Sequence, residues 1–122
     1  MVINIESSHR YAQPELFFSE VFRVLKPSGY FLFADFREDK ELEELKFQLK
    51  NSKFQLEKKQ DITSNVVEAL KLITHDREIL IKKLLPRFLQ NLGKNFAATV
   101  GSPTYNKFLE RKFVYLNYVF KK

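Results

Sequence analysis

A proline-containing turn followed by an apolar run constrains the fold of this 122-residue chain more than any other segment. Residues 23–36 read RVLKPSGYFLFADF. Pro27 cannot continue a helical hydrogen-bond ladder, and Gly29 gives the turn its backbone freedom. The run from Tyr30 to Ala34 is apolar on both faces, which is typical of a strand covered on both sides in α/β folds. The segment therefore predicts a helix end, a tight turn and a buried strand.

Helical and strand periodicities alternate along the rest of the chain. Strands are expected at residues 2–5, 30–34, 54–59 and 113–120, and helices at 15–25, 40–51, from 65, from 76 and from 103. Asn65 and Asp76 are the expected caps of two successive helices. Pro86 should kink or split the second of these, and Gly93 should end it. This alternation implies right-handed crossovers and a mostly parallel sheet, with the last strand central in it.

The composition favours a single α/β domain over residues 1–122, because 44% of the residues are apolar. No apolar run approaches the ~20 residues of a membrane span, and no signal peptide pattern is visible. The chain has no cysteine, which excludes disulfides and thiolate metal sites and fits a cytoplasmic location. The two histidines lack the carboxylate spacing of a metal site, so no metal is expected.

Charge is distributed unevenly along the chain. Residues 1–44 carry five Lys/Arg and nine Asp/Glu, whereas residues 45–122 carry sixteen and six. A solvated face rich in lysine is the simplest interpretation, and an acidic partner or an anionic lipid surface is the alternative. No basic motif with interleaved aromatic residues occurs, so nucleic-acid binding is not expected.

An apolar stripe runs from Ile79 to Leu92 and is accompanied by Lys82, Lys83 and Arg87. Its spacing favours a helix packed on a core. A lid helix, or a helix that faces a lipid surface, is the alternative interpretation.

Several segments together resemble class I S-adenosylmethionine-dependent methyltransferases. The RVLKPSG turn and the strand after it resemble the RVL+PGG signature of that family, with Ser28 in the place of a glycine. Residues 2–11, VINIESSHRY, look like the fourth strand and following loop of members that act on lipids or other small apolar acceptors. The DIT step at Asp61 and the run from Phe113 to Phe120 are similar to the end of the sixth strand and to the seventh strand.

The resemblance implies a partial Rossmann-like methyltransferase sheet of the α/β class. Its expected strand order is 4-5-7-6, with the last strand antiparallel and helices on both faces. The chain then corresponds to the C-terminal portion of the fold. Its first strand would lie at an open edge, and an apolar edge invites pairing with another chain. A homo-oligomer or a complementary N-terminal half is therefore the expected partner.

The Gly-rich loop that holds S-adenosylmethionine in this family has no counterpart in the chain. The three glycines, Gly29, Gly93 and Gly101, form no G-x-G arrangement. That loop lets the backbone approach the cofactor next to a helix N-terminus. The resemblance leaves only Asn4 and Ile5, at the end of the first strand, as cofactor contacts. We expect S-adenosylmethionine to be the cofactor of the family and its binding by this chain alone to fail.

The polar residues after the first two strands are the candidate site, because ligands bind at the carboxyl ends of strands in open α/β sheets. Glu6 and His9 are the candidate catalytic residues, since methyl transfer needs an aligned and deprotonated nucleophile. Tyr11, Asp35 and Arg37 are the candidate substrate-binding residues. An ordinary polar loop, with Asp35 and Arg37 pairing locally after their strand, is the structural alternative.

Two functions therefore stand open. The chain is expected to be part of an S-adenosylmethionine-dependent methyltransferase that acts on a small or lipid-like acceptor, and to be inactive alone. The alternative is a non-catalytic interaction module that binds a partner through its open sheet edge or its basic face.

Overall fold

The computed structural model describes residues 1–122, and it divides into two compact units. The first unit contains residues 1–62 and 114–122, and the second contains residues 63–113. Each unit is described by itself below. The expectation of a single domain stays a prediction. No helix of the structure is both long enough and apolar enough to cross a membrane.

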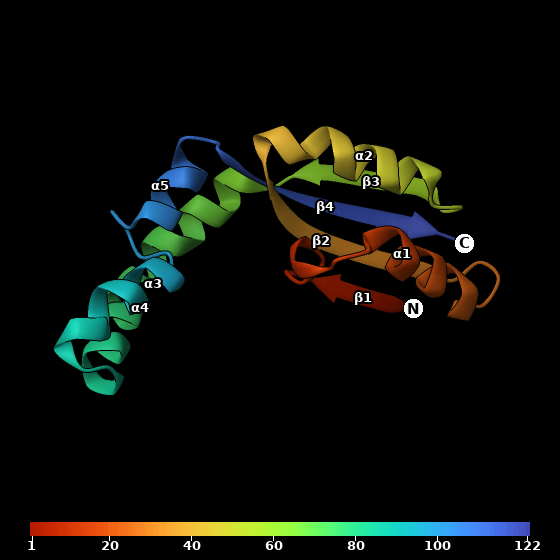
Figure 1. Ribbon diagram of the computed structural model, residues 1–122. Helices are drawn as coiled ribbons and strands as arrows, with labels where there is room; N and C mark the ends of the chain where they lie inside the picture. The colour runs from red at the N-terminus through yellow and green to blue at the C-terminus, as the bar shows by residue number, and fades with distance from the viewer. The chain divides into compact units, whose positions relative to one another are not determined.

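The first unit is a four-stranded sheet with two helices (Figure 1). Its elements are β1 (Val2–Ile5), α1 (Pro14–Val24), β2 (Tyr30–Glu38), α2 (Leu42–Asn51), β3 (Gln55–Asp61) and β4 (Phe113–Lys121), with short 3-10 turns at Ser8–Arg10 and Asp39–Glu41. The strand order is β1-β2-β4-β3. β1 pairs with β2 in parallel, whereas β3 and β4 are antiparallel. In the numbering of the methyltransferase sheet this is the predicted order 4-5-7-6, which the structure confirms.

Phenylalanine side chains dominate the core of this unit. Phe31 and Phe33 of β2 are fully buried and pack against Phe18 of α1, with ring centroids 5.6–6.3 Å apart. The same cluster includes Leu45 and Leu49 of α2, so both helices cover one face of the sheet. The sequence predicted helices on both faces of the sheet. Within this unit, α1 and α2 cover one face only.

β2 is longer than the sequence predicted. The strand continues past Ala34 to Glu38, and alternate side chains are buried along it. Asp35 and Arg37 therefore lie within the strand, and the prediction that they follow it is wrong. Both side chains are buried because each finds charged and polar partners there, so the strand does not have to end where the apolar run ends.

The turn between α1 and β2 uses its residues differently from the prediction. Ser28 adopts the left-handed conformation, with φ of 61°, whereas Gly29 does not have a positive φ. A Cβ atom on Gly29 would lie 2.8 Å from the backbone oxygen of Lys26. Glycine is thus required at position 29 for a close backbone approach rather than for φ freedom.

The second unit is helical and consists of α3 (Thr63–Leu84), α4 (Gln90–Phe96) and α5 (Pro103–Leu109), with a 3-10 turn at Arg87–Leu89. The predicted boundary at Asp76 is wrong, because α3 continues through it. No glycine or proline lies between Thr63 and Leu84, and a single Asp in a helix costs only a few tenths of a kcal/mol. The helix ends just before Pro86 instead, as proline chemistry requires.

Gly93 lies inside α4 and is not the expected helix cap. A Cβ atom at this position would be 2.6 Å from Cδ1 of Leu85 and 3.3 Å from Cγ2 of Ile81. The missing side chain therefore allows α4 to pack closely against the C-terminal end of α3.

Candidate functional site

The candidate site lies at the carboxyl ends of β1 and β2. The parallel register places Ile5 opposite Ala34, and the amide of Glu6 donates to the carbonyl of Ala34 at 2.9 Å. The 3-10 turn that follows β1 is thereby held beside the last residues of β2. Residues 26 to 29 positions apart in the sequence come into contact there.

Asp35 is the centre of this site. Asp35 is buried, with only 1% of its surface exposed. Oδ2 accepts hydrogen bonds from the Ser8 hydroxyl at 2.6 Å and from the His9 amide at 3.0 Å, and it lies 3.1 Å from the Arg37 guanidinium. Oδ1 lies 2.7 Å from Nδ1 of His9 and accepts from the amide of Phe36 at 2.9 Å. Five contacts thus satisfy one buried carboxylate.

These contacts keep Asp35 ionised despite its burial. Burial alone raises the pKa of the carboxyl group, because the charged form loses its hydration. The hydrogen bonds from Ser8 and His9 and the charge of Arg37 act in the opposite direction and outweigh it. The pKa of Asp35 is therefore lower than its ordinary value.

His9 is held in one orientation by that carboxylate. Its ring lies against Phe36, with centroids 4.5 Å apart, and its side chain remains 18% exposed. Since an ionised Asp35 only accepts hydrogen bonds, the neutral ring must carry its proton on Nδ1. Nε2 is then a free base, which is the arrangement of a general base backed by a carboxylate.

Ser8 and Arg37 contact Asp35 and each other, and so they hold the Asp35 carboxylate in place beside His9. Nη2 of Arg37 donates to the Ser8 hydroxyl at 2.7 Å, and Nη1 donates to the carbonyl of Phe36 at 2.8 Å. Both residues are buried. Ser8, His9, Asp35 and Arg37 thus form one polar network, and the side chain of His9 is the most exposed of the four.

Glu6 contacts a different residue at this end of the sheet, Tyr115 of β4. It has a left-handed backbone, with φ of 50°, directly after the last residue of β1. Its carboxylate accepts a hydrogen bond from Tyr115 of β4. Burial, and then the negative charges of Glu6 and Asp35, raise the pKa of the Tyr115 hydroxyl. Tyr115 therefore stays protonated and a donor at neutral pH.

Asn4 forms a second, smaller cluster. Its Nδ2 donates to Ser7 Oγ at 2.8 Å and to the Tyr11 hydroxyl at 3.0 Å. The Tyr11 ring packs on Phe17, with centroids 4.9 Å apart. Oδ1 of Asn4 is buried and has no hydrogen-bond partner, which leaves an acceptor available to a donor from outside the chain.

The structure brings most of the predicted site residues to one end of the sheet. His9, Asp35 and Arg37 share a network, Asn4 contacts Tyr11, and Glu6 contacts Tyr115. Ile5 is exposed on β1. The roles assigned to these seven residues stay predictions.

Sequence reasoning missed Ser8 and Tyr115. Ser8 lies in the polar segment after the first predicted strand, and Tyr115 lies in the last predicted strand, whose apolar character gave it no candidate role. Neither has a local signal, because each acquires its polar partner only when distant strands pair. No group of three or more His, Asp or Glu side chains is arranged to bind a metal ion.

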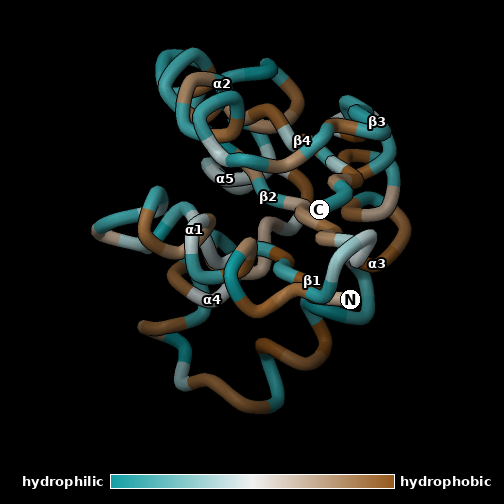
Figure 2. Tube along the Cα trace, turned by 90° about the vertical axis from the view of Figure 1, so that its right-hand side faces the viewer, coloured by the Kyte–Doolittle hydropathy of each residue, from teal (hydrophilic) through white to brown (hydrophobic).

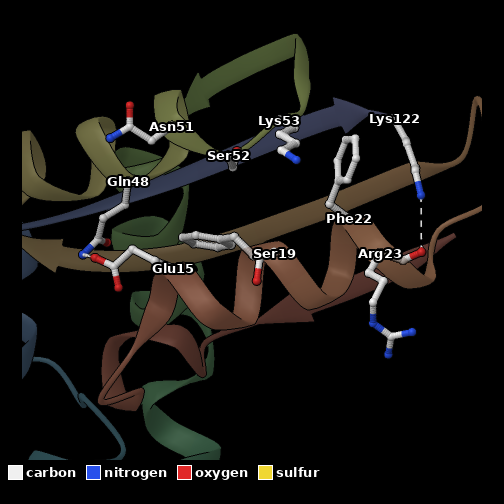
Figure 3. A pocket seen from close by; sticks show the side chains of 10 residues that line it. Glu15, Ser19, Phe22, Arg23, Gln48, Asn51, Ser52, Lys53 and Lys122 are labelled. Carbon is white, nitrogen blue, oxygen red and sulfur yellow. Dashed lines mark hydrogen bonds between the residues drawn. The ribbon is translucent and has the colours of Figure 1, made fainter.

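A cavity of about 440 Å³ lies elsewhere in this unit, between α1 and α2 (Figure 3). Phe18 and Phe22 give it an apolar wall, and Lys122 closes one end by donating to the carbonyls of Leu25 and Arg23. At the other end Gln48 donates to Glu15 at 2.8 Å. None of its lining residues belongs to the network around Asp35.

The residues present do not by themselves fit S-adenosylmethionine. The unpartnered Oδ1 of Asn4 offers one acceptor. The three glycines, however, lie before β2, within α4 and in the turn before α5, and none joins a strand end to the start of a helix. The backbone approach that the cofactor requires is therefore absent from this chain.

Three curated proteins that are similar to this chain are named as methyltransferases. A probable phthiotriol/phenolphthiotriol dimycocerosates methyltransferase 2 of Mycobacterium ulcerans is 34% identical over 103 residues, which are 84% of this chain and 40% of that protein. A phthiotriol/phenolphthiotriol dimycocerosates methyltransferase of Mycobacterium tuberculosis is 30% identical over all of this chain and 45% of its own length. A fatty-acid O-methyltransferase of Mycolicibacterium smegmatis is 29% identical over 99% of this chain and 43% of its own length. No family model matches the sequence.

Solved structures share the fold. A putative sarcosine dimethylglycine methyltransferase from Galdieria sulphuraria superposes with a TM-score of 0.71 at 14% identity, over 98% of this chain and 51% of that one. An O-methyltransferase region of StiE gives 0.70 at 18% identity, over 99% and 43%. A phosphoethanolamine-type N-methyltransferase 2 from Haemonchus contortus, solved with S-adenosylhomocysteine, gives 0.58 at 16% identity, over 99% and 33%. The chain thus spans less than half the length of the curated relatives named above.

Proposed function

We propose that this chain, which resembles the C-terminal half of class I S-adenosylmethionine-dependent methyltransferases, supplies the acceptor-activating part of such an enzyme. The observation that carries the proposal is the network around Asp35, which fixes the His9 ring at the carboxyl ends of two parallel strands. Ligands bind at this position in open α/β sheets. Most of the residues that hold the cofactor lie outside this chain in this proposal.

The acceptor that we propose is a lipid-like molecule with a hydroxyl group. The curated relatives carry names that refer to phthiotriol dimycocerosates and to fatty acids. Groups of this kind become nucleophiles when they lose a proton. His9 is placed to take that proton on Nε2, while Asp35 stabilises the resulting imidazolium.

The other residues have supporting roles in this scheme. Asp35 and Arg37 are buried, so they position His9 rather than touch the acceptor directly. Tyr11 and Glu6 lie on the exposed side of the same loop and are the proposed acceptor contacts. Asn4, through its unpartnered Oδ1, is the proposed contact of this chain with the cofactor.

The partner that completes the enzyme is proposed to pair along β1. This strand forms one edge of the sheet, and Ile3 and Ile5 are exposed on it. An unpaired edge with apolar side chains is a template for another strand. A half that carries the Gly-rich loop would supply both the missing strand and the cofactor site, and a second copy of this chain would supply only the strand.

Calorimetry and activity measurements test these claims separately. The isolated chain should give no binding heat with S-adenosylmethionine, and tight binding would contradict the dependence on a second half. The chain should then be joined to the N-terminal half of the M. ulcerans relative and assayed for methyl transfer to a long-chain lipid alcohol, whose hydroxyl keeps its proton at neutral pH until a base removes it. In that protein His9→Gln should lower kcat by about 10²- to 10⁴-fold, the usual contribution of a general base.

His75→Gln is the matched control, because His75 lies on an exposed stretch of α3 outside the network. It should leave kcat unchanged. Equal activity of the His9 and His75 variants would remove the proposed general base. The alternative function is an interaction module that binds through the β1 edge. Two results together would favour it: the joined protein binds S-adenosylmethionine but methylates no acceptor, and the isolated chain forms a stable complex with another protein.

A further inference from the structure

Several large apolar side chains of the second unit are exposed around the connection between α3 and α4. Phe88 is 82% exposed and Phe96 is 92% exposed. Leu80, Leu84 and Leu92 are exposed as well. These five residues, which we call the apolar tip, come from the C-terminal end of α3, the connecting turn and α4.

Helix packing explains why the apolar tip faces outward. α4 contacts α3 through Gly93, which lies against Ile81 and Leu85. Leu80 and Leu84 are one helical turn apart on α3, and Leu92 and Phe96 are one turn apart on α4. The contact between the helices uses their neighbours, so the exposed pairs have no partner within this unit.

Lys and Arg residues are interspersed along the sequence with the residues of the apolar tip. Between Ile79 and Leu109 the chain has five Lys/Arg and no Asp or Glu. Lys82, Lys83 and Arg87 are exposed, while Lys94 lies 3.8 Å from Glu78. Figure 2 shows apolar stretches alternating with hydrophilic ones along the trace between the labels α3 and α4.

We propose that the apolar tip docks on the surface of an anionic lipid bilayer. Apolar side chains beside Lys and Arg match a membrane interface, where the former enter the acyl boundary and the latter meet anionic headgroups. A second copy of the chain is a poorer occupant, because it would bring two sets of Lys82, Lys83 and Arg87 together. The proposal uses only this unit and does not depend on the methyl-transfer chemistry.

Vesicle co-sedimentation tests the proposal with the full 122-residue chain. The chain should bind vesicles of phosphatidylcholine and phosphatidylglycerol and should bind pure phosphatidylcholine vesicles at least about tenfold more weakly. Raising the salt concentration should weaken the binding, since exposed charges are screened. The triple variant Lys82→Ser/Lys83→Ser/Arg87→Ser should lose the preference for anionic vesicles.

Phe88→Ser/Phe96→Ser should lower the vesicle partition coefficient by at least about tenfold, because two large apolar side chains no longer enter the interface. Phe47→Ser is the matched control. Phe47 is 67% exposed on α2, in the other unit, and its substitution should leave binding unchanged. Circular dichroism of each variant confirms that the helices are intact.

A Phe88→Trp variant gives an independent readout, since the chain has no other tryptophan. Its fluorescence should shift to the blue with anionic vesicles. Three results would overturn the proposal: no binding, equal binding by the Phe88/Phe96 variant, or a dimer in light scattering that this variant abolishes. Loss of vesicle binding when the chain is joined to the N-terminal half of a relative would also overturn it, because the protein itself would then cover the tip.

Discussion

Asp35 shows how one buried residue organises the site. Its carboxylate receives hydrogen bonds from Ser8 and from the backbone and ring of His9, and it is paired with Arg37. Breaking a buried ion pair by removing one partner costs more than the pair contributes, because the other charge stays desolvated. The network therefore stabilises the fold and fixes the His9 ring with the same contacts.

Replacement of Asp35 should make stability less dependent on pH in acid. The pKa of Asp35 is below its ordinary value of 3.8 in the folded chain, so the unfolded chain binds the proton first as the pH falls. Its contribution to stability is complete above that ordinary value and is lost as the pH falls through the lowered one. Asp35→Asn should cost about 3 kcal/mol at neutral pH, and the difference from the parent should shrink below about pH 3.8.

Urea unfolding at several pH values measures this difference. Glu20→Gln is the control, because Glu20 is exposed and pairs with Arg23 on the surface of α1. It should change stability little at any pH. A constant difference between the Asp35 variant and the parent across the acid range would contradict the prediction.

Ser28 carries a small backbone strain that glycine would remove. A non-glycine residue in the left-handed region costs about 1 kcal/mol or more, and Ser28 has φ of 61°. Ser28→Gly should therefore raise the free energy of unfolding by about 1 kcal/mol. Ser52→Gly, at a position with φ of −67°, is the control and should be neutral or destabilising.

At the scale of elements, β2 contributes both to the hydrophobic core and to the candidate site. Its buried phenylalanines join the core, and its last residues form the candidate site. Phe31 is in ring contact with Phe18 of α1, Phe33 of β2, Phe54 just before β3 and Phe120 of β4. A change at Phe31 is thus felt by both the core and the strand that positions Asp35.

Phe31→Ala should destabilise the chain by about 3–5 kcal/mol, the usual cost of a large cavity in a packed core. Phe47→Ala, on the exposed face of α2, should stay within about 0.5 kcal/mol of the parent. Urea unfolding compares the two. A small effect at Phe31 would show that the aromatic cluster collapses around the cavity.

At the scale of the whole molecule, the open edge at β1 is the dominant feature of the sheet unit. The relatives are more than twice as long as the segments that match this chain, so their fold contains further structure. β3, at the opposite edge, is a contrast, because its side chains are mostly polar or charged. Charged residues on an edge strand discourage pairing with another chain.

Association through β1 should be sensitive to charge on that strand. We expect light scattering after size-exclusion chromatography to show oligomers of the isolated chain at high concentration. Ile3→Lys/Ile5→Lys should shift the population to monomer. Leu56→Lys, on the β3 edge, should have no effect, and a monomeric parent at high concentration would count against the proposed partner.

Local sequence signals were sufficient for the turn at Pro27 and for the alternation of strands and helices, whereas the order of the strands was predicted from the family resemblance. They failed at Asp76 and Gly93, because a weak local preference was outweighed by the continuity of α3 and by the packing of α4 on it. The roles of Ser28 and Gly29 were exchanged for a similar reason. Both residues suit a tight turn, and only the path of the backbone decides which of them takes the positive φ.

The sequence by itself determined that strands and helices alternate along the chain and that Glu6, His9, Asp35 and Arg37 lie near the carboxyl ends of its first two strands. Periodicity and turn chemistry act over a few residues, so they suffice for that. Only the tertiary structure decided that His9 and Asp35 form a pair, that Ser8 and Arg37 lie behind them, and that Tyr115 meets Glu6. These contacts join residues far apart in the chain, and they form only when β1, β2 and β4 become neighbours in the sheet.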